Sequence, residues 1–152
     1  MGVLDRLAEI GLNVPVLPKP AGAYVPATMT GNLCYSSGQT GTVDGRLLYT
    51  GRLGAEITLE DGYKSAQLAM LNVLAELQWA LGDLDRITRV VKLTGFVASA
   101  QGFGQQPKVV NGASELLERI LGERGKHARS SVGVAELPFG APVEIEVVVE
   151  FN

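Results

Sequence analysis

The chain has 152 residues, of which 46% are hydrophobic and 19% are charged, and its net charge is −3. These values are typical of a single domain, here residues 1–152, that buries a core without disulfides. Acidic and basic residues are interspersed, and no basic run offers the positive surface that holds a phosphate backbone, so we expect no nucleic-acid partner.

The single cysteine and the single histidine limit the possible chemistry. Cys34 lies in the apolar run 33–35, which favours a buried strand residue over a reactive thiol. Together with His127 it cannot form a Cys/His zinc site, and we expect no metal and a structural role for the histidine. No apolar run reaches the roughly 20 residues that span a bilayer, and no secretory signal begins the chain. We therefore expect no membrane association and a cytoplasmic location.

Residues 1–20 are predicted to form a short helix and a proline-rich extension. The helix is expected over Val3–Ile10, with Leu4, Leu7 and Ile10 on one side and Gly11 as its end. Four prolines follow between residues 14 and 26, which indicates an extended connector.

The next segment predicts a hairpin and a long helix. Residues 32–38 are rich in β-formers, and Asp44-Gly45 is a strong turn signal before a return strand over 46–49. Thr58 can cap a helix, with Asp61 completing an approximate capping box. Apolar residues then recur at helical spacing until Gly82 ends the helix.

The C-terminal half predicts a strand over 90–99, a helix from Pro107 to Leu121, and strands over 130–135 and 143–151. The element order indicates an α+β domain in which two long helices cover one face of a mixed sheet. We expect the opposite face to carry a mainly polar set of side chains: Ser131, Gly133, Glu144, Glu146 and Val148. This face is either exposed to solvent or covered by other subunits.

The sequence lacks the motifs of several enzyme classes. It has no Gly-x-x-x-x-Gly-Lys-Ser/Thr phosphate loop, no Gly-x-Gly-x-x-Gly dinucleotide fingerprint and no Gly-x-Ser-x-Gly elbow. The remaining chemistry relies on arginine, glutamate, hydroxyl and backbone groups. Arginine can bind a carboxylate through its planar fork, and a nearby glutamate can orient a water molecule, so no cofactor is needed.

Residues 127–138 read His-Ala-Arg-Ser-Ser-Val-Gly-Val-Ala-Glu-Leu-Pro. This segment resembles the Ala-Arg-Ser-x-Val-x-Val-x-x-Leu-Pro signature of the Rid (reactive intermediate deaminase) family, also called YjgF-like or endoribonuclease L-PSP. Val-Glu-Ile-Glu at 143–146 is similar to the family's ending, and Ser-Gly-Gln at 37–39 to one of its strand ends.

The resemblance implies a chorismate-mutase-like homotrimer with sites in the clefts between subunits. It implies hydrolysis of 2-imino acids or their enamine tautomers to 2-keto acids and ammonia. Arg129 would bind the substrate carboxylate and Glu144 would position the attacking water. Further residues matching the family's pocket are Tyr24, Ser37, Gly38 and Asn111, and Ser131, beside Arg129, would either line that pocket or simply pack.

The proline-rich start and the helix over residues 107–114 resemble a longer sister subgroup of the family, and the signature itself departs from the family pattern. Ser131 stands where many deaminases have cysteine, and His127 replaces a common proline. A non-catalytic trimer that binds a small carboxylate or serves regulation is the alternative function. An endoribonuclease, a label that some relatives carry, is disfavoured by the acidic balance of the chain.

Overall fold

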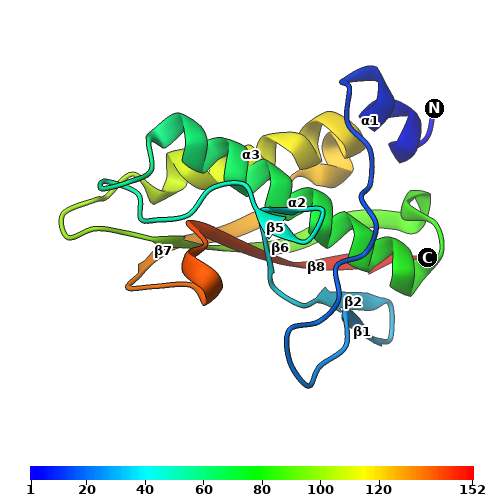
Figure 1. The fold of residues 1–152 in the computed structure, drawn as a ribbon. Helices are drawn as coiled ribbons and strands as arrows, with labels where there is room; N and C mark the ends of the chain where they lie inside the picture. Colours follow the sequence, from blue (N-terminus) through cyan, green and yellow to red (C-terminus); the bar gives the residue numbers. More distant parts are fainter.

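The computed structural model describes all 152 residues and contains a six-stranded sheet with two long helices on one face (Figure 1). This arrangement confirms the predicted α+β class. The elements in chain order are α1 (Val3–Glu9), β1 (Ala27–Thr30), β2 (Leu33–Ser36), β3 (Gln39–Thr40), β4 (Thr42–Val43), β5 (Arg46–Leu47), α2 (Leu59–Leu81), the short helix η1 (Leu84–Arg86), β6 (Ile87–Ala98), α3 (Gln106–Leu121), η2 (Gly122–Gly125), β7 (Ala128–Val134), η3 (Pro138–Gly140) and β8 (Val143–Phe151).

The strand order across the sheet is β1-β2-β8-β6-β7, and β3 also pairs with β8. All pairs in this sheet are antiparallel except β6 and β7. These two are parallel because α3 connects them as a crossover on the helical face. β7 is therefore an edge strand that lies beside β6, while β3 lies on the far side of β8.

The two long helices begin and end where the sequence predicts. The Thr58 side chain accepts a hydrogen bond from the Asp61 backbone amide at 3.1 Å, and Gly82 ends α2 with φ +80°. α3 has Pro107 in its first turn and Gly122 after its last residue. Where the helices cross, Gly112 lies so close to the Tyr63 carbonyl oxygen that a side chain there would overlap it. None of the helices combines the length and the apolar composition that spanning a bilayer requires.

One core of 30 buried residues lies between the sheet and the helices. β8 alternates as predicted, with buried residues at Val143, Ile145, Val147 and Val149 and half-buried ones between them. Cys34 is fully buried on β2, which confirms its prediction as a strand residue of the core.

The predicted apolar side of the N-terminal helix is confirmed for Leu7 and Ile10 and wrong for Leu4. α1 buries Val3 and Leu7, whereas Leu4 is 53% exposed. The cause is the docking of α1 on α3 and η1, where the Val3 amide donates to the Asp85 carboxylate at 2.8 Å. The hairpin at Asp44-Gly45 is present, but its return strand ends at Leu47. Strands β1 and β3 were not predicted.

The predicted open face of the sheet was wrong for Ser131 and Gly133. Residues paired across parallel strands share a face, and Ser131 pairs with Gly95, where an added side chain would overlap Val110 of α3. Ser131 and Gly133 therefore face the helices, where small residues fit beneath α3. Val132 faces the opposite side and is 43% exposed because β7 lies at the edge.

Candidate functional site

Arg129 projects from β7 towards α3 and is held there by three hydrogen bonds. Its Nη1 donates to Asn111 Oδ1 at 2.8 Å and to Ser114 Oγ at 3.1 Å. Its Nη2 donates to the Pro107 carbonyl oxygen at 3.3 Å. Residues 107, 111 and 114 recur at helical spacing, so a single face of α3 fixes the plane of the guanidinium group.

Every partner of Arg129 is a neutral oxygen. No carboxylate of the chain lies within ion-pair distance of it, although other basic residues form such pairs. A guanidinium group has five N–H donors. Three are used in these bonds, so the Nε–H group and one Nη2–H group remain for a ligand. Two residues further along β7, the buried Ser131 hydroxyl has no hydrogen-bond partner.

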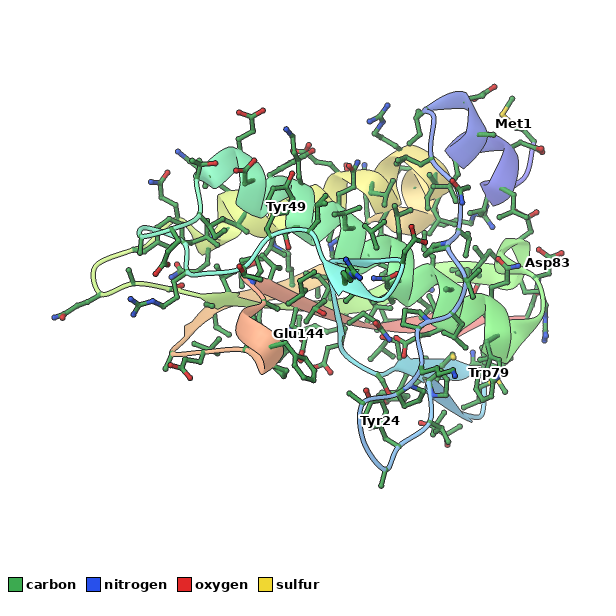
Figure 2. The ribbon with its side chains drawn as sticks, viewed as in Figure 1. Met1, Tyr24, Tyr49, Trp79, Asp83 and Glu144 are labelled. Carbon is green, nitrogen blue, oxygen red and sulfur yellow. The ribbon has the colours of Figure 1, made fainter.

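Glu144 lies on β8, on the sheet face away from the helices (Figure 2). It pairs with Thr40 of β3 on one side and Phe96 of β6 on the other, and it is half-buried. Its carboxylate lies over Gly38, where a Cβ atom would come within 2.7 Å of Oε2. Burial, and to a lesser degree the Glu146 charge, raises the pKa of Glu144.

Ser37 and Tyr24 belong to the same side of the molecule as Glu144. The Ser37 hydroxyl donates to the Val25 carbonyl oxygen at 2.6 Å, which ties the end of β2 to the segment that carries Tyr24. The Tyr24 ring is 47% exposed, and its hydroxyl oxygen accepts from the Ala21 amide at 3.1 Å. Figure 2 shows Tyr24 in a loop on the side of the sheet opposite the helices.

The predicted residues thus form two groups. The Arg129 group, on the helical face at the β7 edge, contains Arg129, Asn111 and Ser131. The Glu144 group, on the opposite face, contains Glu144, Gly38, Ser37 and Tyr24. Strand β6 lies between β7 and β8, and Arg129 pairs with Leu93 on the buried side. The structure therefore does not bring Arg129 and Glu144 together within one chain.

Sequence reasoning missed two residues of the Arg129 group. Ser114 contacts the guanidinium group directly, and His127 bonds to Ser114 at 2.8 Å. Ser114 could have been found, because it follows Asn111 by three residues on the same helix face. His127 gave no such signal, since its contact depends on the path of the chain through η2. No group of three or more histidine, cysteine or acidic side chains could hold a metal ion.

The sheet order and the two helices on one face define an α+β protein of chorismate-mutase-like architecture. The model of the YjgF/chorismate mutase-like family, whose description also includes an endoribonuclease label, matches residues 4–149. The chain belongs to this family.

Three comparisons illustrate the relationship. The chain is 44% identical to protein TCP17 of Trypanosoma cruzi, over 99% of its own length and 94% of that protein. It is 34% identical to a 2-iminobutanoate/2-iminopropanoate deaminase of Dermatophagoides farinae, over 91% and 93%. The crystal structure of Atu1372 from Agrobacterium tumefaciens, described as of unknown function, matches with a TM-score of 0.93 and 45% identity, over 99% and 92%.

Proposed function

We propose that the protein hydrolyses 2-imino acids, or their enamine tautomers, to 2-keto acids and ammonia. The observation that carries this proposal is the Arg129 guanidinium group, which is fixed by three neutral oxygens, has no carboxylate partner and lies on the same face as the unpaired Ser131 hydroxyl. These groups suit a substrate carboxylate. The deaminase name of a relative 34% identical to the chain supports the reaction class.

In the proposed reaction, water adds to the carbon of the protonated C=N bond. Glu144 orients the water, accepts one of its protons and returns that proton to the amine nitrogen of the tetrahedral adduct. The adduct then loses ammonia, and its hydroxyl proton passes to solvent to leave the keto group. The raised pKa of Glu144 makes its carboxylate a stronger base than an exposed one. The protonated imine is already electrophilic, so orientation by Arg129 and Glu144 supplies most of the required catalysis.

The proposal requires that two subunits share a site, because Arg129 and Glu144 lie on opposite faces of one chain. A homotrimer in which the Arg129 group of one subunit meets the Glu144 group of the next satisfies this requirement. The open sheet face suits such an interface, since it carries partly exposed apolar side chains at Tyr35 and Val132, 44% and 43% exposed. We expect a particle of three times 16.1 kDa by light scattering.

The first test is an ammonia-release assay in which an amino-acid oxidase generates imine from several amino acids. The protein is expected to accelerate ammonia release, and Arg129→Ala to abolish the effect while the oligomer persists. Arg89→Ala is the matched control, because Arg89 is an exposed arginine of β6 that pairs with Glu150. Full activity of Arg129→Ala would refute the site assignment.

The second test asks whether the site lies between chains. Arg129→Ala and Glu144→Ala subunits are each expected to be inactive alone. When they are co-refolded at equal amounts, about one site in four combines an intact Arg129 with an intact Glu144 from the next subunit, so about a quarter of wild-type activity returns. A mixture as inactive as its parents would exclude a shared site.

The same experiments separate the alternative functions. A regulatory or carrier trimer would bind a 2-keto acid through Arg129 without accelerating ammonia release. An endoribonuclease would cleave RNA, and that cleavage would have to depend on Arg129 or Glu144 to be assigned to this site. RNA cleavage that persists in both variants would indicate a contaminant.

A further inference from the structure

The hydrogen bonds of Arg129 continue beyond the residues that contact it, to a histidine that begins the approach to β7. His127 is half-buried between η2 and α3. Its Nδ1 lies 2.6 Å from the Gly125 carbonyl oxygen and its Nε2 lies 2.8 Å from Ser114 Oγ. Ser114 is 8% exposed and contacts Arg129 Nη1 at 3.1 Å. One chain of hydrogen bonds therefore links Gly125, His127, Ser114 and Arg129.

The partners fix the direction of two of the three bonds in this chain, and the direction of the third follows for a neutral imidazole ring. A carbonyl oxygen can only accept, so Nδ1 carries the proton and donates to Gly125. In the neutral ring, Nε2 is then an acceptor, and the Ser114 hydroxyl donates its proton to it. The lone pairs of Ser114 Oγ are left to accept from Arg129, a group that can only donate.

Without the histidine, the Ser114 hydroxyl would have other choices. A serine inside a helix commonly rotates to donate to the carbonyl four residues earlier, which moves its oxygen atom. Arg129 would then lose one of the two acceptors that hold its Nη1 group, and Asn111 alone would remain for that nitrogen. The orientation of the free Nε–H and Nη2–H groups depends on the plane that these acceptors define.

We propose that His127 is a positioning residue that orients the Arg129 guanidinium group for carboxylate binding by holding the Ser114 hydroxyl. The inference rests on the proposed function of Arg129 as the carboxylate ligand. The proposal gives a role to His127, which stands where the family signature commonly has proline. A proline side chain cannot form a hydrogen bond.

Two substitutions of His127 separate orientation from simple packing. In His127→Asn the amide can replace Nδ1 and donate to Gly125, but it is too short to reach Ser114. In His127→Gln the longer side chain can place its oxygen near the position of Nε2 and accept from Ser114. The probe ligand is 2-oxobutanoate. We expect His127→Asn to weaken its binding about tenfold, because this factor corresponds to the loss of one hydrogen bond to a charged group. His127→Gln is expected to restore most of the affinity.

Ser114→Ala supplies the second arm. It is expected to weaken binding by a similar factor, and adding His127→Asn to it is expected to change nothing further, because both act through one hydroxyl. Ser65→Ala, which removes another buried helix hydroxyl, is the matched control. In the imine assay, kcat/KM should fall by at least the same factor, because a misoriented Arg129 binds the carboxylate more weakly and also places the imine carbon less well for the attacking water.

Nitrogen-15 NMR of the Arg129 Nε–H group gives a readout that needs no ligand. The signal is expected to show restricted side-chain motion in the wild type and in His127→Gln, and faster motion in His127→Asn and Ser114→Ala. If the wild type binds no keto acid but the NMR differences between the variants are observed, the proposed function is overturned. The role of His127 in positioning Arg129 is then retained. Equal Arg129 motion and equal affinity in His127→Asn and the wild type would overturn the positioning role.

Discussion

Glu76 of α2 is a carboxyl group buried in the core, and its burial predicts a strong dependence of stability on pH. It is 1% exposed, and its Oε1 atom has no hydrogen-bond partner. Burial raises the pKa of Glu76 from an ordinary value of 4.5 to about 8, although the Gln39 side chain acts in the opposite direction. The folded protein therefore holds the Glu76 proton at pH values where the unfolded chain has lost it.

The sign of the effect follows from the two pKa values. The carboxyl group is protonated in both states below pH 4.5, so it then imposes no cost. As the pH rises from 4.5 to about 8, only the unfolded chain ionises, and stability falls; above about 8 the cost is constant. A pKa difference of about 3.5 corresponds to about 5 kcal/mol, of which about 4 kcal/mol falls between pH 5 and pH 9. Relaxation of the surroundings reduces both of these free-energy differences.

The test is urea unfolding of the wild type and Glu76→Gln at pH 5, 7 and 9 and at a fixed protein concentration. The two proteins should differ little at pH 5, and Glu76→Gln should be more stable by several kcal/mol at pH 9. Glu60→Gln, an exposed substitution on the same helix, is the control and should follow the wild type. A difference between Glu76→Gln and the wild type that varies by less than about 1 kcal/mol across this range would refute the reasoning.

Three substitutions test other parts of the structure. Gly38→Ala should lower kcat in the ammonia-release assay with little change in melting temperature, because the new methyl group displaces the movable Glu144 carboxylate; unchanged kcat would contradict the placement of Glu144. Gly112→Ala should cost more than about 3 kcal/mol in urea unfolding, because its methyl group meets the Tyr63 backbone. Thr58→Ala should cost about 1 kcal/mol by the same measurement, through loss of the α2 cap, and a stability equal to that of the wild type would exclude this role.

The elements predicted well are those in which local and long-range signals agree. Thr58 both caps α2 and precedes a long run of apolar residues at helical spacing, so the helix start could be located to the residue. β8 alternates over its whole length because one face lies on the core and the other does not. Both patterns are set by burial against a single large partner.

The elements predicted badly depend on where the chain lies relative to its neighbours. β3 has two residues and exists only because Gln39 and Thr40 lie against β8. A period of two shows that β7 has two faces but not which one is buried. The valine face was expected to be buried, yet α3 lies so close to β7 that only small residues fit beneath it, and Val132 is left exposed. The helix partners of Arg129 lie 15 to 22 residues away in sequence.

The family signature at 129–146 contains both proposed functional groups within one continuous segment, and the fold separates them. Arg129 leaves the sheet on the helical face at an edge strand, whereas Glu144 leaves it on the opposite face of a central strand. No change of side-chain rotamer can bring the two through a sheet. The proposed hydrolysis therefore depends on association of subunits, while the proposed binding of a carboxylate by Arg129 involves only α3 and β7 of one chain. Dissociation of the proposed trimer should accordingly abolish turnover while the hydrogen bonds that hold Arg129 within one chain persist.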